Sequence, residues 1–218
     1  MNLIHAKNKV SLLIKITNKI LKKKFFARHS TLVAPDLIGC KLIRQFDNKY
    51  SIKGIIVETE AYSQEEASCH GHLMKTKRNS PLFGEPGSLY IYKSYGIHHC
   101  LNIVTSKNSF ASGVLIRSVE IENNNERCAS GPGLVTRIFQ IGLEFNSLEI
   151  ANNNYLKIYD CGLNFNNSDL VNTFRIGINK AQDLKWRWYL RNSRSISKRE
   201  KGDKTPKKSC LFSKYTQK

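Results

Sequence analysis

The sequence has no apolar run near the roughly 20 residues that a membrane-spanning helix needs, so we do not expect an integral membrane protein. It has no Cys-x-x-Cys pair either, although it contains six cysteines. They lie far apart in the chain, at positions 40, 69, 100, 128, 161 and 210. Such spacing is typical of neither a disulfide scaffold nor a zinc ribbon. Because we also see no clear signal peptide, we expect a reducing compartment.

Acidic residues are scarce at both ends of the chain. Residues 1–28 contain eight Lys and Arg and no Asp or Glu, while residues 185–218 contain twelve Lys and Arg against Glu200 and Asp203. The residues between them carry fifteen charges of each sign, so the net charge of +18 comes from the two ends. A neutral body with basic ends favours a polyanionic partner such as a nucleic acid, and a solubilising tail is the alternative.

With 218 residues, of which 40% are hydrophobic and 10% aromatic, the chain can form one folded domain. We expect this domain at 25–192, between a basic N-terminal extension, 1–24, and a basic C-terminal tail, 193–218. Apolar residues among the lysines of the extension also suit an organellar transit peptide or a helix on a membrane surface. Its scarcity of Arg and its short apolar runs favour an extension that becomes helical on a polyanion.

Short elements of both kinds are predicted along the neutral body. Apolar spacing predicts a helix over 31–38, in which Pro35 suits only the first turn, and a second short helix that begins at 130–132. The predicted strands are 41–46, 54–62, 89–92, 100–105 and 113–119, and the predicted Asn-rich loops are 123–125, 152–154 and 164–167. Many strands with few helices indicate an α+β fold, a single mixed domain whose curved, mostly antiparallel sheet is flanked by short helices.

The predicted strand at 54–62 carries two acidic residues in an apolar setting. Because successive side chains of a strand face opposite sides, Glu58, Glu60 and Tyr62 share one face with Ile56. The other face is apolar and suits a core. Carboxylates on such a strand cost free energy unless they are paired, hydrated or used, so the strand is either an edge strand with a solvated face or part of a functional site.

Motifs that surround and follow this strand decide between the two interpretations. They are Glu-Thr-Glu-Ala-Tyr at 58–62, Thr-x-Arg-Asn at 76–79, Phe-Gly-x-Pro-Gly at 83–87, Tyr-x-Tyr-x-x-Tyr-Gly at 90–96, Leu-Asn at 101–102, Val-Leu-Ile-Arg at 114–117, Ser-Gly-Pro-Gly at 130–133 and Arg-Ile-Gly-Ile at 175–178. Taken in this order, over roughly residues 25–192, they closely resemble the alkyladenine (3-methyladenine) DNA glycosylase family, and so many ordered matches are far more specific than one motif.

The resemblance implies a DNA repair enzyme that flips out alkylated or deaminated purines, hydrolyses the N-glycosidic bond and leaves an abasic site. By resemblance, Glu60 deprotonates water and balances positive charge on the sugar. Arg117 matches the arginine that helps to hold this water, and a backbone carbonyl within 175–178 completes the water site. A cationic alkylated purine leaves without a strong acid, so one carboxylate suffices and Glu58 is a bystander.

The same resemblance assigns residues that contact the flipped base. Tyr62, His70 and Tyr92 match the residues that sandwich the base, and Asn102 matches a residue that looks over the purine edge. Tyr95 matches the tyrosine that is inserted into the duplex in place of the flipped nucleotide. We expect Tyr90 to pack in the core. Tyr92 and Tyr95 could do the same, but Tyr95 lies in a turn next to glycine, which favours exposure.

Further expectations concern the DNA backbone and the acidic strand. Arg78 and the turn that contains Gly131 and Gly133 suit phosphate contacts, through positive charge and helix-start amides respectively. Arg117 could alternatively pair with Glu120 or another acid. No lysine nucleophile is identified, so we expect a glycosylase that does not cut the DNA backbone.

No cofactor or metal follows from the resemblance. Four histidines, at 70, 72, 98 and 99, together with Cys69 and Cys100 would suit zinc only if they had a standard ligand spacing, which they lack. The expected partner is double-stranded DNA with damaged purines, bound by a monomer and without a membrane. The expected location is the cytoplasm of a bacterial cell, with a nucleus or organelle as alternatives. The alternative function is a non-catalytic basic protein that binds DNA or RNA with the same fold.

Overall fold

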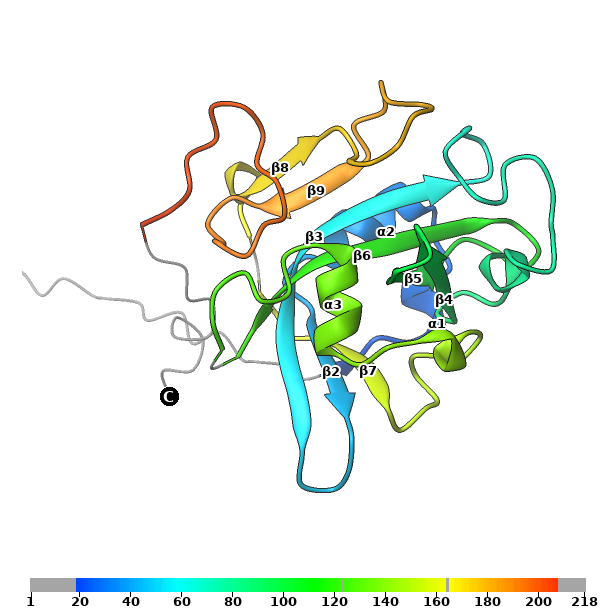
Figure 1. Ribbon diagram of the computed structural model, residues 1–218, viewed down its shortest axis with the longest axis horizontal. Coiled ribbons are helices and arrows are strands. Elements are labelled where there is room, and N and C mark those ends of the chain that lie inside the picture. Colours follow the sequence, from blue (N-terminus) through cyan, green and yellow to red (C-terminus); the bar gives the residue numbers. More distant parts are fainter. Residues whose placement is uncertain (1–18, 123, 164, 208–218) are drawn as a thin grey trace, which may run out of the picture.

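The structure of the chain is a computed structural model that describes residues 19–122, 124–163 and 165–207 (Figure 1). Most of the predicted N-terminal extension and the end of the predicted C-terminal tail therefore lie outside the described residues, as do Asn123 and Asn164 of the predicted loops. None of the helices in the described part of the chain is long and apolar enough to cross a membrane.

Nine strands form one sheet in this described part. They are β1 Lys19–Ile20, β2 Lys41–Gln45, β3 Ser51–Ser63, β4 Leu89–Ser94, β5 His98–Val104, β6 Ser112–Ile121, β7 Leu156–Asp160, β8 Leu170–Thr173 and β9 Arg187–Leu190. The helices are α1 Lys23–Phe26, α2 Ser30–Asp36 and α3 Pro132–Ile138, with single 3-10 turns at Ser80–Phe83, Leu143–Phe145 and Asn167–Asp169. The predicted strands and helices all fall on these elements. Strands β1, β7, β8 and β9 and helix α1 were not predicted.

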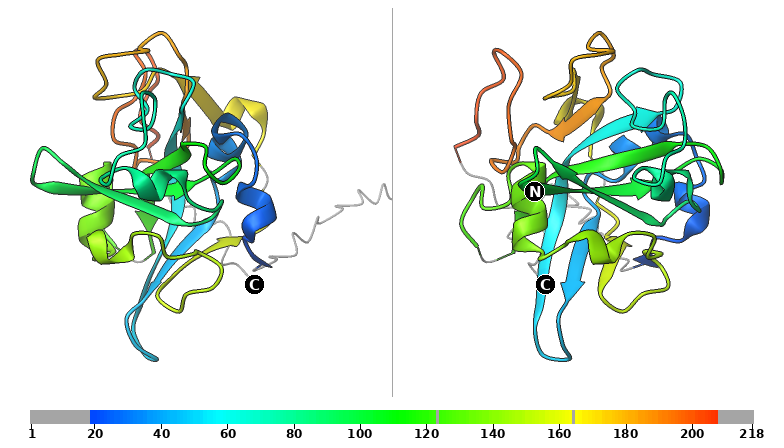
Figure 2. Two further views of the ribbon diagram at one scale, coloured as in Figure 1. Left: turned by 90° about the vertical axis from the view of Figure 1, so that its right-hand side faces the viewer. Right: turned by 45° about the vertical axis from the view of Figure 1, so that its right-hand side comes forward.

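The strands pair in the order β1-β7-β2-β3-β6-β5-β4, while β9 joins β3 and β8 joins β9. All of these pairings are antiparallel. Helices α2 and α3 lie on opposite sides of the sheet, α2 against β3 and α3 against β5 and β6 (Figure 2). The prediction of an α+β domain with a mostly antiparallel sheet and short helices is therefore confirmed.

Strand β3 is the centre of the sheet and changes its partner halfway along. One edge pairs with β6, and the other pairs first with β2, over Ser51–Ile55, and then with β9, over Glu58–Glu60. The register with β6 is irregular on both sides of Glu58, so the strict alternation expected for this strand is interrupted there. Because β3 is paired along both edges, the interpretation of an edge strand with a solvated face is wrong.

Helix α2 packs against strand β3. The Thr59 hydroxyl of β3 donates to the carbonyl of Ala34 at 2.8 Å, which ties the helix to the strand. Pro35 lies in the last turn of this helix rather than the first, which corrects the sequence-based expectation. Because Pro35 has no N–H, it cannot donate to the carbonyl four residues earlier. The loss is confined to the last turn, since the helix ends one residue later.

Two clusters of buried apolar residues support the sheet. The larger one joins α1, α2 and α3 to the central strands, and includes Phe26, Leu37 and Phe139 with no exposed surface. The smaller one is built on Leu82, Phe83 and Tyr90, and Tyr62 and Tyr92 pack against it with part of their surface free. The second cluster therefore carries aromatic residues that the sequence assigns to a pocket.

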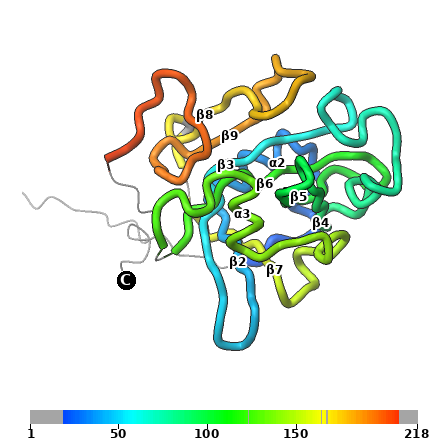
Figure 3. The backbone as a smooth tube through the Cα atoms, in the orientation of Figure 1, coloured from blue at the N-terminus to red at the C-terminus, as the bar shows by residue number. Residues whose placement is uncertain are grey.

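Residues 193–207, which we name the C-terminal segment, pack against the sheet. Figure 3 shows this segment in orange to red beside β9. Ile196 is 1% exposed and belongs to the larger core cluster, and Ser193 and Ser195 are also buried. The first part of the predicted basic tail is thus held by apolar burial as well as by polar contacts.

Candidate active site

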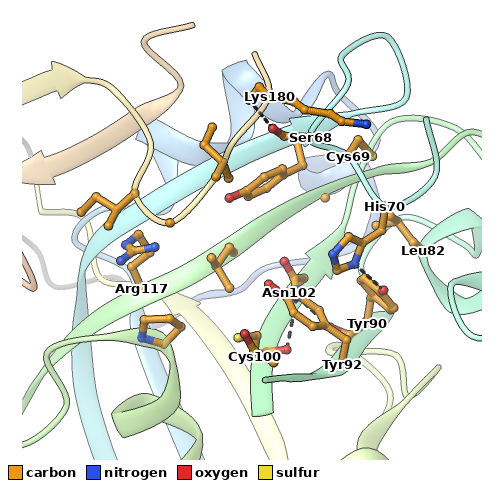
Figure 4. A pocket seen from close by; sticks show the side chains of 18 of the residues that line it. Ser68, Cys69, His70, Leu82, Tyr90, Tyr92, Cys100, Asn102, Arg117 and Lys180 are labelled. Atoms are coloured by element: carbon orange, nitrogen blue, oxygen red, sulfur yellow. Dashed lines mark hydrogen bonds between the residues drawn. The ribbon is translucent and has the colours of Figure 1, made fainter. Parts of the chain in front are cut away.

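A pocket of about 630 Å³ opens where β3 and β6 meet the β4–β5 hairpin (Figure 4). Two loops complete its rim, one at 67–70 and the other at 176–180. The pocket brings together all of the residues that the sequence assigns to the base pocket, together with Tyr95 and Arg117. They are Tyr62, His70, Tyr92, Tyr95, Asn102 and Arg117.

Glu60 lies behind this pocket with no exposed surface. Its Oε2 accepts hydrogen bonds from Arg117 Nη1 at 3.1 Å and from the Tyr62 hydroxyl at 2.9 Å. Its Oε1 accepts the backbone N–H of Ile176 at 2.8 Å. A carboxylate has about four lone-pair sites, so three donors leave capacity for one more hydrogen bond.

Arg117 joins the two acidic residues of β3. Its Nη1 contacts Glu60, and its Nε lies 3.4 Å from Glu58 Oε1. Burial alone would lower the pKa of the Arg117 guanidinium, but the carboxylates of Glu60 and Glu58 outweigh it and raise this pKa above its ordinary value. The guanidinium is therefore a permanent cation. Glu120 accepts a hydrogen bond from Ser193 at 2.7 Å, and the acid that Arg117 contacts besides Glu60 is Glu58.

Glu58 is as buried as Glu60 but is saturated with donors. It accepts hydrogen bonds from Ser118 Oγ at 2.7 Å and from Arg187 Nη1 at 2.8 Å. Ser197 donates both its backbone N–H and its hydroxyl to the same carboxylate, each at 2.8 Å. We name the group Glu58, Glu60, Arg117 and Arg187 the acidic wall. In it, two carboxylates balance two guanidinium groups.

Three rings line the pocket, and we name them the aromatic wall: Tyr62, His70 and Tyr92. The Tyr62 hydroxyl touches the acidic wall at Glu60. His70 and Tyr92 form an edge-to-face pair with centroids 4.5 Å apart. A hydrogen bond of 2.8 Å joins His70 Nδ1 to the hydroxyl of Tyr90, a buried residue of β4. Figure 4 shows His70 and Tyr92 across the pocket from Arg117.

Titration of this wall is suppressed by burial. Burial, followed by the positive charge of Arg78, lowers the pKa of His70 below its ordinary value. Burial and then the Glu60 carboxylate raise the pKa of Tyr62 well above its ordinary value. At neutral pH the wall is therefore uncharged, which suits stacking on a flat apolar or cationic group.

The Tyr62 ring is in contact with the guanidinium of Arg175. The guanidinium of Arg175 lies 4.7 Å from the Tyr62 ring centroid and 5.4 Å from that of Trp186. Arg175 also pairs with Glu66 through two hydrogen bonds, of 2.7 and 2.9 Å. The residue that follows, Ile176, supplies the N–H to Glu60. One arginine thus holds a ring of the aromatic wall and the loop that contacts the acidic wall.

Asn102 lies on β5 and is 5% exposed. Its Nδ2 donates to the carbonyls of Tyr90 at 3.1 Å and Cys100 at 3.2 Å. Because both amide hydrogens are used, the side chain is held in one orientation at the pocket wall.

Burial raises the pKa of the neighbouring Cys100 thiol, and raises that of Cys69 to about 11, so both thiols are neutral at physiological pH.

Tyr95 lies at the tip of the β4–β5 hairpin and is 88% exposed. Tyr95 and Gly96 have φ angles of +49° and +70°, and the N–H of Ile97 donates to the carbonyl of Ser94 at 3.1 Å. Two left-handed residues closed by such a bond form the tight turn that suits the twist of a hairpin. The turn presents a large aromatic ring to solvent at the mouth of the pocket, as the sequence predicts.

The residues assigned to the DNA backbone lie around the same mouth. Arg78 is exposed and donates to the carbonyl of Lys93 at 3.3 Å. Gly131 precedes α3 with a φ of +127°, and its N–H donates to the carbonyl of Arg117 at 2.9 Å. A side chain at Gly133 would meet His98 at 2.9 Å, so this glycine permits close packing of α3 on the hairpin. Both glycines therefore also have a structural role.

No group of three or more His, Cys, Asp or Glu within the described residues is arranged to hold a metal ion. The polar contacts of the candidate zinc ligands are instead internal. His70 is bonded to Tyr90, and His72 Nδ1 bonds to the carbonyl of Gln64 at 2.8 Å.

Sequence reasoning missed several residues that organise the site. They are Glu66, Arg175, Arg187 and Ser197. Arg175 lies inside a recognised motif, but nothing in that motif indicates what its side chain contacts. Arg187 and Ser197 lie in the stretch whose positive charge was counted as a basic end. Alternation of aromatic residues at 186–189, typical of a strand, is the signal that could have marked Arg187 as part of the sheet.

The chain is similar to known proteins over most of its length. Residues 24–194 match the sequence model of the family described as methylpurine-DNA glycosylase. The chain is 36% identical over 198 residues to a protein of Trichodesmium erythraeum, covering 83% of this chain and 98% of that protein. It is 38% identical over 192 residues to a protein of Carboxydothermus hydrogenoformans, covering 83% and 100%. A protein of Ehrlichia ruminantium is 39% identical over 180 residues, covering 81% and 92%. All three carry the provisional name 3-methyladenine DNA glycosylase.

Proposed function

Because the chain belongs to the methylpurine-DNA glycosylase family, we propose that it removes alkylated or deaminated purines from duplex DNA and leaves an abasic site. The observation that carries this proposal is the juxtaposition of the buried Glu60 carboxylate with a pocket lined by Tyr62, His70 and Tyr92. The carboxylate supplies a base, and the pocket supplies uncharged faces for a flipped purine.

Hydrolysis proceeds through a water molecule held at Glu60. The carboxylate takes a proton from the water while the water oxygen bonds to C1′ of the sugar, and the electron pair of the C1′–N bond leaves with the purine. Arg117 and the Ile176 N–H orient Glu60, and we assign the second contact of the water to a carbonyl within 175–178. The Glu60 carboxylate also offsets positive charge that develops on the sugar.

The aromatic wall favours alkylated purines. A purine that carries an alkyl group on a ring nitrogen is cationic, and a cation is attracted to the face of an aromatic ring. The fixed amide of Asn102 limits the room for an exocyclic amine at the purine edge. Tyr95, exposed at the hairpin tip, fills the space in the duplex that the flipped nucleotide leaves.

Contacts to phosphates come from the rim of the pocket and from the basic ends. We assign Arg78, Gly131 and Gly133 to the rim. Four lysines of the C-terminal segment have exposed side chains, Lys198, Lys201, Lys204 and Lys207. Replacing all four by Gln should lower duplex affinity and flatten its dependence on salt, because each phosphate contact contributes about 0.9 to the slope of log K against log salt.

The proposed function also bears on the oligomeric state and the cellular location of the protein. A single chain contains the whole pocket, so we propose that the protein acts as a monomer on double-stranded DNA. Its relatives come from bacteria, and we propose a bacterial cytoplasm, where chromosomal DNA is present, as its location.

The test is single-turnover excision from labelled duplexes that contain ethenoadenine, hypoxanthine or 7-methylguanine, read out by alkaline cleavage. The wild-type protein should produce strand breaks only after alkali treatment. Glu60→Gln should retain lesion binding and lose excision by about 100-fold or more, the range for removal of a general base. Glu120→Gln, a second buried acid of the same sheet that does not contact Arg117, is the matched control and should excise normally.

Two results would contradict the proposal. Excision by Glu60→Gln near the wild-type rate would mean that another group activates water. Tight binding with no cleavage of any lesion by the wild-type protein would favour the alternative of a non-catalytic nucleic-acid-binding protein.

A further inference from the structure

The C-terminal segment, residues 193–207, makes its most specific contacts with the acidic wall. Ser197 donates two of the four hydrogen bonds to the buried Glu58 carboxylate, one from its backbone N–H and one from its hydroxyl. Ser197 and Glu58 are 139 residues apart in the chain. A carboxylate with no exposed surface needs such donors, because an unpaired buried charge is strongly unfavourable.

The Ser197 hydroxyl also contacts the arginine that holds Glu60. Arg117 Nη2 donates to Ser197 Oγ at 3.5 Å, while the same oxygen donates its own hydrogen to Glu58 Oε1 at 2.8 Å. A hydroxyl can do both at once, since it has one hydrogen and two lone pairs. Ser197 therefore lies between Glu58 and Arg117, and its hydroxyl gives each of them a hydrogen-bond partner.

A second contact ties the segment to the other cation of the acidic wall. Arg187 Nη1, which donates to Glu58 at 2.8 Å, also donates to the carbonyl of Lys198 at 2.7 Å. The segment is thus hydrogen-bonded through Ser197 to Glu58 and Arg117, and through Lys198 to Arg187.

The segment is itself rigidly attached to the domain. Ile196 is inserted into the main core, and Ser193 donates to Glu120 at 2.7 Å. Further along, Asp203 pairs with Arg199 at 2.8 Å and accepts from the Tyr189 hydroxyl at 2.7 Å. Ser197 is held from both sides, so its two donors have a fixed position at Glu58.

Most of this segment lies outside the family match, which ends at residue 194. We infer that Ser197 is a positioning residue, which acts through Glu58 to keep Arg117 directed at Glu60. The inference rests on the proposed function for its effect on rate, but its geometry is independent of the substrate. Ser197 does not line the pocket, so it should set the rate of excision and leave lesion binding unchanged.

The physical reason is competition for one guanidinium. Arg117 Nε is buried without a hydrogen-bond partner, 3.4 Å from Glu58 Oε1. When the Ser197 hydroxyl is removed, Oε1 keeps Arg187 at 2.8 Å but loses its second donor, and Arg117 Nε is the nearby donor that has no other hydrogen-bond partner. Rotation of Arg117 toward Glu58 then weakens its 3.1 Å contact with Glu60.

The experiment compares three variants of the full chain, Ser197→Ala, Ser197→Thr and Ser195→Ala. Ser195 is the matched control, because it is a buried serine of the same segment whose hydroxyl bonds to the N–H of Arg127 rather than to the acidic wall. We expect Ser197→Ala to reduce the single-turnover excision rate about tenfold, the size of one hydrogen bond to a charged group, with an unchanged Kd for lesion-bearing duplex. Ser197→Thr retains the hydroxyl and should restore the rate, and Ser195→Ala should match the wild type.

A second readout does not need activity. The Nε–H resonance of Arg117 in a ¹H–¹⁵N spectrum, assigned with Arg117→Lys, should move in Ser197→Ala and stay in place in Ser195→Ala. An unchanged rate and an unmoved resonance in Ser197→Ala would overturn the inference, as would equal losses in the two Ala variants or a weakened Kd. If the wild-type protein excises nothing but the resonance moves in Ser197→Ala alone, the proposed function fails and the positioning role stands.

Discussion

The two walls of the pocket are built in different ways. The aromatic wall comes from one continuous stretch of chain, Tyr62 to Tyr92, and is held by ring packing and a hydrogen bond from His70 to Tyr90. The acidic wall collects residues from β3, β6 and β9, is held by charge, and is hydrogen-bonded to the C-terminal segment through Ser197. Packing tolerates small changes in ring position, whereas a buried charge network tolerates little, so we expect the two walls to respond differently to substitution.

This difference separates two tasks. A wall of uncharged rings selects which base enters and how tightly it is bound. A wall of fixed charges determines how well a water molecule is activated, because the donors around Glu60 are in place before the substrate arrives. The comparison therefore predicts that binding and rate can be changed independently.

The largest effect is expected where one residue serves both walls. Arg175→Met removes the partner of Glu66, which is 6% exposed, and leaves a buried carboxylate unpaired. Such a change costs about 3–5 kcal/mol of the free energy of unfolding. Urea denaturation followed by fluorescence measures it. Arg191→Met, which removes an ion pair whose arginine side chain is 47% exposed, should cost about 1 kcal/mol or less. Equal losses in the two variants would mean that the buried pair has no special role.

A smaller effect is expected from removing either of two tyrosine hydroxyl groups at the pocket, those of Tyr62 and Tyr90. Tyr62→Phe keeps the ring but removes the donor to Glu60, so excision should slow about tenfold with little change in lesion affinity. Tyr90→Phe instead removes the hydroxyl that is hydrogen-bonded to His70, so it should weaken lesion affinity and leave the single-turnover rate nearly unchanged. Binding titrations and single-turnover assays on both variants provide the comparison. The same pattern in both would show that the walls are not separate.

The smallest effect concerns the charge state of the aromatic wall. Arg78 is the second cause, after burial, of the lowered pKa of His70, so Arg78→Gln should raise this pKa toward its ordinary value of about 6.5. At any pH below that value, more of His70 is then protonated than in the wild type. An NMR titration of the imidazole measures the shift. Lys77→Gln, a neighbouring exposed cation, is the control, and an equal shift there would exclude a specific effect of Arg78.

Much of the fold could be predicted because its signals are local. The strands at 54–62 and 113–119 and the helix that begins at 130–132 follow from apolar patterns and from glycine and proline at their ends. β9 was missed because Arg187, Arg191 and their neighbours were counted as part of a basic end. The structure pairs Arg187 with Glu58 and Arg191 with Asp203, so a positive residue in the sequence is not always a positive charge available to DNA.

The candidate site could be predicted only in part, for a related reason. The motifs indicate which residues gather at a pocket, and the structure brings Glu60, Arg117 and the aromatic residues together there. The contacts that hold them span long stretches of chain, 116 residues from Glu60 to Ile176 and 139 from Glu58 to Ser197. No periodicity or spacing encodes such contacts. The register irregularity on both sides of Glu58 is also invisible in the sequence.

The most direct test of the account is a paired measurement on one substitution in each wall. Single-turnover excision rates and lesion-duplex Kd values should be determined for Arg117→Gln and Tyr92→Leu on a 7-methylguanine duplex. We predict that Arg117→Gln slows excision about 100-fold or more with a Kd within about twofold of the wild type, since one donor to the reacting group is lost. Tyr92→Leu should weaken Kd about tenfold and change the rate of the bound complex little. Parallel losses of rate and affinity in both variants would contradict the division of the pocket into a wall that binds and a wall that reacts.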